Sequence, residues 1–165
     1  YFDATGDRHI SMFRALHYPN QPETPLDGQM RAGAHADYGA LTILRQENVP
    51  GSLQVCNKAG LWVDVPAIPG TFVVNIGDLM MQWTNDKWVS TMHRVVNPPR
   101  DKAHDASRIS LVYFHQPNYD ALVSCLESCQ GPGQPARYAP ITSGDHLVSK
   151  FVKQTTLGGT KEAAE

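Results

Sequence analysis

The sequence has 165 residues, of which 41% are hydrophobic, so the chain can bury one core and is expected to form a single domain over residues 1–165. Its formal net charge of −2 provides no basic surface, which argues against nucleic acid as the main partner. No apolar run approaches the ~20 residues of a membrane span and no signal peptide opens the chain, so no membrane partner is expected.

Short apolar runs recur through the first two thirds of the chain, and residues that favour turns separate them. The runs cover residues 41–44, 53–55, 61–65, 72–76, 91–96 and 109–114. Pro50-Gly51 and Pro98-Pro99 are two of the breakers between them. Many short strands with this punctuation predict an antiparallel sandwich or barrel, for which a jelly roll is the natural closure. The expected fold is therefore mainly β with short helices.

Two helices are expected beside these strands. Residues 78–83 predict a short helix with Asp78 as a plausible N-cap. After Pro117 the chain becomes a loop rich in proline and glycine, and residues 145–154 predict a C-terminal helix. The domain therefore divides into a motif core of about residues 16–118 and a C-terminal loop and helix over residues 119–165.

One residue separates two potential metal ligands, His35 and Asp37. On an extended strand residues i and i+2 share a face, roughly 7 Å apart, so an imidazole and a carboxylate there can close on one ion. His93 in a later run offers a third ligand, and two histidines with one carboxylate are typical of non-haem Fe(II) oxygenases. A bare His-x-Asp pair lies more often at a solvated strand end, so a metal site needs further support.

Arg108 and Ser110 repeat the same i, i+2 spacing with a guanidinium and a hydroxyl. Arginine presents a rigid charged fork that matches a carboxylate, and serine adds a donor. Facing a metal, such a pair would hold the far carboxylate of a dicarboxylic acid whose near end chelates the ion. Taken alone, an arginine before a strand is more often an ordinary surface residue.

These motifs together resemble those of the iron- and 2-oxoglutarate-dependent dioxygenases of the isopenicillin N synthase-like group. The resemblance runs from about His17 to Asn118. The segments that carry it are His35-Ala36-Asp37-Tyr38-Gly39, Val73-Val74-Asn75-Ile76-Gly77-Asp78, Ser90-Thr91-Met92-His93-Arg94-Val95 and Arg108-Ile109-Ser110. It implies the double-stranded β-helix of that family, a jelly roll of the cupin kind.

The resemblance also implies roles for individual residues. His35, Asp37 and His93 are expected to bind Fe(II). Arg108 and Ser110 are expected to bind the distal carboxylate of the co-substrate 2-oxoglutarate. No catalytic side chain is assigned beyond this metal centre.

Tyr18 matches the family tyrosine that reaches the same distal carboxylate. Two residues before that tyrosine, many plant members have Asn, whereas this chain has Leu16. A co-substrate contact found in those members is therefore expected to be missing here.

The implied activity is that of a dioxygenase that uses O2 and 2-oxoglutarate to oxidise a small organic substrate, by hydroxylation or desaturation, with release of succinate and CO2. One alternative is an iron oxidase of the same fold that does not consume 2-oxoglutarate. Isopenicillin N synthase is such a relative, and its Arg-x-Ser pair binds the carboxylate of the substrate itself. The other alternative is a truncated jelly roll that binds ligands without catalysis.

Members of this family usually carry a largely helical N-terminal half, whereas only about seventeen residues precede the motif region here. That half is therefore expected to be absent, leaving an exposed apolar patch that could pair with the missing half or with a second copy. The cysteines Cys56, Cys125 and Cys129 are interpreted as free thiols of a reducing compartment, which predicts a cytoplasmic location.

Overall fold

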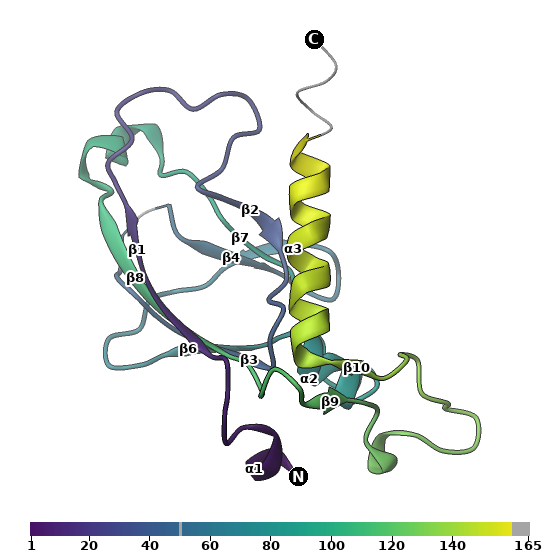
Figure 1. Ribbon diagram of the computed structural model, residues 1–165. Helices are drawn as coiled ribbons and strands as arrows, with labels where there is room; N and C mark the ends of the chain where they lie inside the picture. The colour runs from purple at the N-terminus through teal and green to yellow at the C-terminus, as the bar shows by residue number, and fades with distance from the viewer. Residues whose placement is uncertain (50, 160–165) are drawn as a thin grey trace.

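The computed structural model describes residues 1–49 and 51–159. Two four-stranded antiparallel sheets face each other, and a long helix stands beside them (Figure 1). The first sheet has the order β1 (Met12–Tyr18), β8 (Arg108–His115), β3 (Leu41–Gln46) and β6 (Val73–Ile76). The second has the order β2 (Ala32–His35), β7 (His93–Val95), β4 (Leu53–Cys56) and β5 (Trp62–Asp64). This arrangement confirms the predicted mainly β jelly roll.

The remaining elements lie mainly around one end of the two sheets. A small sheet pairs β9 (Leu122–Val123) with β10 (Ile141–Thr142). The helices are α1 (Phe2–Thr5), α2 (Asp78–Trp83) and α3 (Ser143–Gly159), and short 3-10 turns cover Arg100–Asp105 and Glu127–Cys129. Among the described residues, no helix is both long and apolar enough to cross a membrane.

Each predicted apolar run corresponds to one strand, and the ends of run and strand differ by at most two residues. β1 lies outside those runs, because Arg14 and His17 interrupt its apolar residues. The predicted C-terminal helix over residues 145–154 is confirmed within α3, which begins earlier, at Ser143.

The helix over residues 78–83 is confirmed, but the proposed N-cap is wrong. Gly77 occupies the N-cap position of α2 and makes no side-chain cap hydrogen bond. The Asp78 carboxylate instead pairs with the Lys150 ammonium of α3 at 2.6 Å. The Asp78 side chain therefore forms a long-range ion pair and not the local capping hydrogen bond that the sequence pattern predicted.

The buried apolar cluster lies where α2 and β9 meet, at one end of the sheets. Leu79 and Trp83 of α2 pack there with Ala40 and Val123. The indole N–H of Trp83 donates to the Tyr1 hydroxyl at 2.8 Å, which ties the beginning of the chain to this cluster. The space between the two large sheets is different, because much of its lining is polar.

The first sheet exposes an apolar outer face. Side chains alternate along each strand, so residues next to those that line the inter-sheet space point outward. Phe13, Tyr113, Ile43 and Val74 are consecutive register partners across β1, β8, β3 and β6. Phe13 is 63% exposed and Val74 55%. The predicted exposed apolar patch is therefore present on this sheet, and we call these four residues the outer face.

Candidate metal centre and carboxylate site

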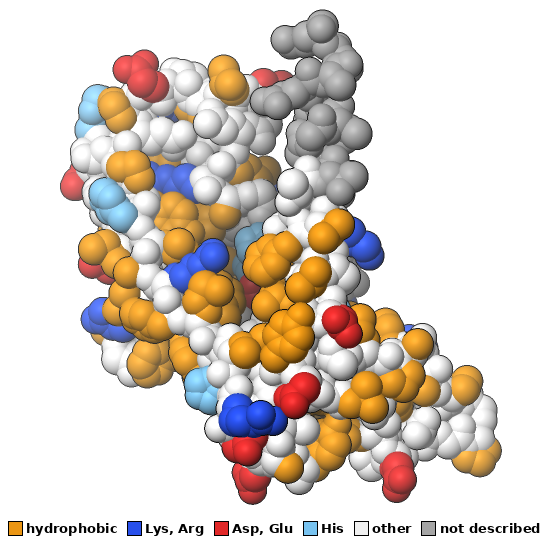
Figure 2. Space-filling model, viewed as in Figure 1, with side chains coloured by type: hydrophobic (Ala, Val, Ile, Leu, Met, Phe, Trp, Pro, Cys, Tyr) orange, Lys and Arg blue, Asp and Glu red, His pale blue; other side chains and the backbone are white. Residues whose placement is uncertain are grey.

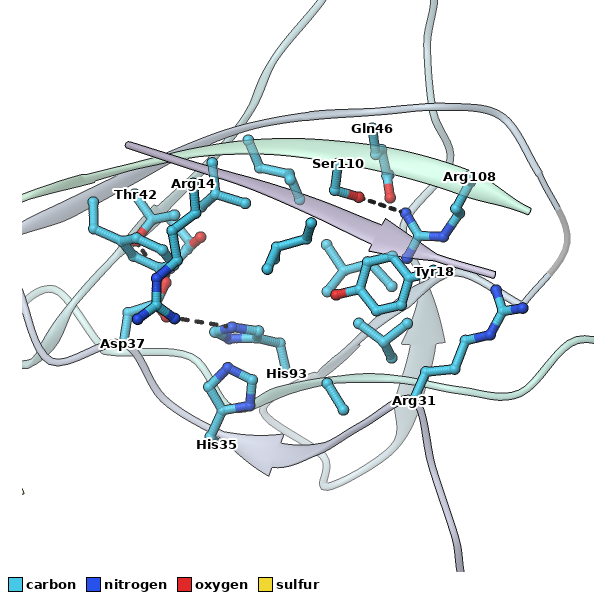
Figure 3. A pocket seen from close by; sticks show the side chains of 18 of the residues that line it. Arg14, Tyr18, Arg31, His35, Asp37, Thr42, Gln46, His93, Arg108 and Ser110 are labelled. Atoms are coloured by element: carbon cyan, nitrogen blue, oxygen red, sulfur yellow. Dashed lines mark hydrogen bonds and ion pairs between the residues drawn. The ribbon is translucent and has the colours of Figure 1, made fainter. Parts of the chain in front are cut away.

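His35 and His93 lie opposite each other on neighbouring strands of the second sheet. His35 ends β2 and His93 begins β7, and the two are register partners with ring centroids 4.4 Å apart. The pairing of β2 with β7 shifts register between Ala32 and His35. Such a bulge re-aims the side chains that follow it, and here both imidazoles point into the inter-sheet space (Figure 3).

Asp37 lies in the loop after β2 and not on an extended strand, as the i, i+2 spacing had suggested. Its carboxylate reaches the two histidines from that loop. β2 ends at His35, and the next residues are held by backbone contacts. The Asp78 N–H donates to the Asp37 carbonyl at 2.8 Å, and the Leu79 N–H donates to the Gly39 carbonyl at 3.0 Å. The N-terminus of α2 therefore fixes this loop, and the Asp37 side chain still lies on the same side as His35.

Gly77 and Gly39 make this close approach possible. A Cβ on Gly77 would overlap the Gly39 carbonyl oxygen, and one on Gly39 would lie 2.6 Å from the His115 carbonyl oxygen. Only a residue without a side chain allows backbones to approach so closely. The two glycines thus let the Asp37 loop pack between α2 and the end of β8.

Hydrogen bonds orient all three candidate ligands. The Nδ1 of His35 lies 2.7 Å from the Gly33 carbonyl, and the Nδ1 of His93 lies 3.0 Å from the Thr91 carbonyl. A carbonyl can only accept, so each Nδ1 carries a proton, and in the neutral ring Nε2 is then the nitrogen with the free lone pair. In metal sites such partners fix the ring orientation and tautomer of a histidine ligand.

The Asp37 carboxylate is oriented in the same way. Its Oδ2 accepts hydrogen bonds from Thr42 Oγ1 at 2.6 Å and from Asn75 Nδ2 at 2.7 Å. Its Oδ1 remains toward His93 Nε2, 3.6 Å away. Sequence reasoning missed Thr42 and Asn75 as partners, although both belong to strand segments that the sequence predicts.

These donors fit a divalent metal ion. One ligand atom from each of His35, Asp37 and His93 lies within 4.8 Å of the others. Two donors bound at right angles, each about 2.1 Å from an ion, are about 3 Å apart. The 3.6 Å separation of His93 Nε2 and Asp37 Oδ1 needs only a small closure to reach that value. Two imidazoles and one carboxylate on one side form the donor set of non-haem Fe(II) centres.

A cavity of about 340 Å³ extends from these ligands between the two sheets. Arg108, Ser110 and Tyr18 line its other end, facing the three candidate ligands across the cavity (Figure 3). All six site residues predicted from the sequence therefore share one cavity, although they come from both sheets and the loop after β2.

Arg108 is a buried cation that forms no ion pair with any described residue. Its side chain is 2% exposed, and burial lowers the pKa of its guanidinium from the usual value. Its Nη1 donates to Ser110 Oγ at 2.7 Å, the Tyr18 ring lies 4.4 Å from its guanidinium carbon, and its Nε has no hydrogen-bond partner. A buried charge is costly unless it is paired, so this end of the cavity is suited to an anion that completes the pairing.

Leu16 and Gln46 flank Ser110 from the two neighbouring strands, as its register partners on β1 and β3. Leu16 lines the cavity with an apolar side chain, as its identity predicts. Gln46 donates through Nε2 to the Val65 carbonyl at 3.0 Å, and its buried Oε1 is without a partner. The alternation of β3 through Thr42 and Leu44 is the signal that could have identified Gln46 as an inward polar side chain.

Arg31 also lines the cavity, but its guanidinium is hydrogen-bonded to backbone carbonyls. Its guanidinium donates to the Ala106 carbonyl at 3.1 Å and to the Pro19 carbonyl at 2.7 Å. These bonds tie the segment before β2 to the loops after β1 and before β8. The structure therefore gives Arg31 a bracing role beside Tyr18.

The sequence profile of the 2OG-Fe(II) oxygenase superfamily matches residues 9–117. The chain is 37% identical over 156 residues to the 2-oxoglutarate-Fe(II) type oxidoreductase hxnY of Emericella nidulans, a match that covers 94% of this chain and 43% of that protein. It is 39% identical over 143 residues to a homoarginine-6-hydroxylase of Oryza sativa subsp. japonica, covering 84% of this chain and 42% of that protein.

Solved structures show the same similarity. A full-length protein of Neurospora crassa, crystallised in complex with alpha-KG, superposes with a TM-score of 0.83 at 38% identity and covers 92% of this chain and 47% of that one. A 2OG-Fe(II) oxygenase family protein from Caulobacter crescentus gives a TM-score of 0.80 at 34% identity, over 92% of this chain and 48% of that one. The chain thus spans less than half the length of these relatives.

Proposed function

The chain belongs to the 2OG-Fe(II) oxygenase superfamily, and from that membership we propose that it is the catalytic portion of an Fe(II)- and 2-oxoglutarate-dependent dioxygenase. The proposed reaction oxidises a small organic substrate with O2, by hydroxylation or desaturation, and releases succinate and CO2. One observation carries the proposal: three converging metal donors lie at one end of a cavity, and a buried arginine with no acidic partner among the described residues lies at the other.

His35, Asp37 and His93 are the residues that would hold the iron. Fe(II), when bound, supplies a site for the 2-oxo acid end of 2-oxoglutarate and for O2, together with the oxidising chemistry. The protein keeps both imidazoles in the Nε2-accepting tautomer and turns Asp37 Oδ1 toward the same point. These hydrogen bonds orient the three ligand atoms toward one point, as the partners of metal ligands do.

Arg108, Ser110 and Tyr18 would hold the distal carboxylate of 2-oxoglutarate. The planar guanidinium offers parallel N–H donors that match a carboxylate. Ser110 accepts from Arg108 Nη1, which leaves the hydroxyl proton of Ser110 available for the carboxylate. The Tyr18 ring covers one face of the guanidinium and restricts its orientation. This contact supports a pre-organised anion site. The site needs no contribution from Leu16, the position at which many plant members have Asn.

A succinate assay on the full-length gene product tests the proposal. We expect iron-dependent formation of succinate from 2-oxoglutarate, stimulated by the right member of a panel of small acids, amino acids and flavonoid-like compounds. Substrate oxidation without succinate would favour the oxidase alternative, in which Arg108 and Ser110 bind the substrate carboxylate. Metal analysis that finds no iron binding would favour a non-catalytic module.

We also propose that the outer face is an interface in the working protein. An apolar sheet face with Phe13 and Val74 more than half exposed is unusual for a protein surface that meets only water. Residues outside the matched portion of a longer chain, or a second copy, would cover it. Analytical ultracentrifugation of the 165-residue chain against its Phe13→Ser variant tests this, and a monomer with equal solubility in both cases would contradict it.

We also propose a cytoplasmic location, because Cys56, Cys125 and Cys129 are all free thiols. The division of the chain as one catalytic domain over residues 1–165 stays a prediction, and residues 160–165 of it lie outside the described part.

A further inference from the structure

A second hollow of about 230 Å³ adjoins the three candidate ligands. It shares Arg14, His35, Asp37 and Phe114 with the inter-sheet cavity, so the two spaces meet beside the metal centre. In the space-filling view, a groove lined with hydrophobic side chains runs between the sheets and α3 (Figure 2). A molecule in this second hollow would therefore reach the metal centre without occupying the end where Arg108 lies.

α3 forms the outer wall of this hollow. Leu147, Phe151 and Gln154 recur at helical spacing and all line it. The pair between Lys150 and Asp78, at 2.6 Å, fixes the helix to the start of α2. The ring of Phe151 meets Tyr38 edge-on, with centroids 6.2 Å apart. Leu147 and Phe151 thus give the wall an apolar part, and the helix is anchored next to the loop that carries Asp37.

Arg14 places a positive charge at the solvent-exposed edge of this hollow. It extends from β1 toward Asp37 and His93 (Figure 3), and its Nε donates to Met12 Sδ at 3.1 Å. None of the ion pairs formed among the described residues includes Arg14. The guanidinium therefore has hydrogen-bond donors left for a ligand.

The charges of the proposed holoenzyme leave Arg14 uncompensated. This step rests on the proposed function. A divalent metal, the Asp37 carboxylate, the 2-oxoglutarate dianion and Arg108 together have formal charges that cancel. Arg31, another arginine of the inter-sheet cavity, donates to backbone carbonyls. Arg14 then remains as an extra positive charge with free donors at the junction of the two spaces.

We propose that the second hollow receives the substrate, and that Arg14 selects a small, largely apolar molecule that carries a carboxylate. The fork of Arg14 would bind the carboxylate of the substrate. Phe114, Leu147 and Phe151 would bury its apolar body, and a C–H bond would thereby be held beside the metal centre. Arg14 would then act as a specificity-determining residue, distinct from the co-substrate arginine Arg108.

Binding measurements with pairs of matched probes test the proposed role of Arg14 and need no catalytic turnover. The probes are benzoate against benzamide and hexanoate against hexanamide, titrated calorimetrically into the full-length gene product in the presence of Mn(II) and saturating 2-oxoglutarate. Each pair differs chiefly in charge. We expect each acid to bind at least tenfold more tightly than its amide, which corresponds to about 1.4 kcal/mol.

Variants then assign the effect to a residue. Arg14→Gln should abolish the preference for the acid while leaving 2-oxoglutarate affinity unchanged. Arg14→Lys should retain part of the preference because it keeps the charge but not the fork. Arg45→Gln, on an exposed β3 position, is the matched control and should change neither affinity.

Several results would overturn the inference. Equal affinities for acid and amide, no binding of either acid, or a preference that survives in Arg14→Gln would each show that Arg14 does not select an anion. A parallel loss of 2-oxoglutarate affinity in Arg14→Gln would place Arg14 in the co-substrate site instead. Because the readout is probe binding, absence of succinate formation would contradict the proposed function but not this inference.

Discussion

His35 and His93 face each other across β2 and β7 with ring centroids 4.4 Å apart, and each imidazole bonds through Nδ1 to the carbonyl of the residue two positions earlier. The same local hydrogen bond thus sets the tautomer of both rings. Their pairing places two nitrogen donors on neighbouring strands, and the Asp37 loop brings in the carboxylate.

Thr42→Val should weaken metal binding. The substitution removes the hydroxyl that donates to Asp37 Oδ2 at 2.6 Å while keeping a similar volume. Loss of such a partner typically lowers metal affinity by about 10–100-fold, and Asn75 remains, so we expect about tenfold. Anaerobic titration with Fe(II) measures it. Thr71→Val, on an exposed turn, is the control, and equal affinities in the two variants would contradict the orienting role of Thr42.

Arg108→Lys should lower the affinity for 2-oxoglutarate at least tenfold, or about 1.4 kcal/mol. Lysine keeps the charge but loses the fork that fits a carboxylate, and it cannot keep the present contact with Ser110 and the Tyr18 ring together. Iron affinity should be little changed. Arg45→Lys provides a control on the same sheet. Unchanged half-saturation by 2-oxoglutarate would favour the alternative in which Arg108 binds the substrate carboxylate.

Gly77→Ala should destabilise the fold by about 3 kcal/mol, at the upper end of the usual cost of overpacking. Its Cβ would overlap the Gly39 carbonyl oxygen, so either α2 or the Asp37 loop must shift. Urea denaturation measures the loss, and metal affinity should fall with it. Gly131→Ala meets no atom within 4 Å and should be nearly neutral. Equal midpoints for the two variants would refute the close-approach argument.

Lys150→Met should loosen α3. The ammonium lies 2.6 Å from Asp78 Oδ2, and the Asp78 side chain is only 9% exposed. Removing one partner of a fully buried pair costs about 3–5 kcal/mol, and we expect about 2 kcal/mol because the Lys150 side chain is 30% exposed. Hydrogen exchange should quicken in α3. Lys153→Met, at an exposed position of the same helix, serves as the comparison, and protection of α3 unchanged in Lys150→Met would contradict the anchoring role.

Tyr138→Phe should destabilise the protein in a pH-dependent way. The Tyr138 hydroxyl donates to Asp86 Oδ1 at 2.6 Å, and this bond raises the pKa of Tyr138 to about 12. Burial alone would raise the pKa of Asp86, but hydrogen bonds from Tyr138 and Arg137 outweigh it and lower that pKa below its usual 3.8. The bond thus requires a neutral phenol and an ionised carboxylate.

The stability that this hydrogen bond contributes is therefore lost at both low and high pH. The Asp86 contribution is present above pH 3.8 and is lost as pH falls through the lower pKa of the folded state. The Tyr138 contribution is present below pH 10 and is lost as pH rises toward 12. We expect Tyr138→Phe to cost about 1 kcal/mol between these limits, since hydrogen bonds to charged groups contribute about 1.5–3 kcal/mol and this one is partly exposed. A stability difference that is constant down to pH 2 would contradict the account.

Local sequence determined much of the candidate site. The spacing of Arg108 and Ser110 placed both on one face of β8, because side chains alternate along a strand regardless of what surrounds it. The short apolar runs between turn residues likewise predicted most of the strands. The identities of His35, Asp37 and His93 were readable from their chemistry, since few side chains bind metals and these three occur in recognisable segments.

Tertiary structure decided which groups meet. Asp37 lies beyond the end of β2, and its position depends on Gly77 approaching Gly39 across almost forty residues of sequence. Thr42 and Asn75 become its partners only when β3 and β6 pair beside the loop. Arg14 and α3 line the same hollow although they are far apart in the sequence, and the Lys150–Asp78 pair helps to hold that helix in place. Local pattern sets the face on which a side chain lies, whereas the neighbour across that face depends on long-range packing, which no short stretch of sequence encodes.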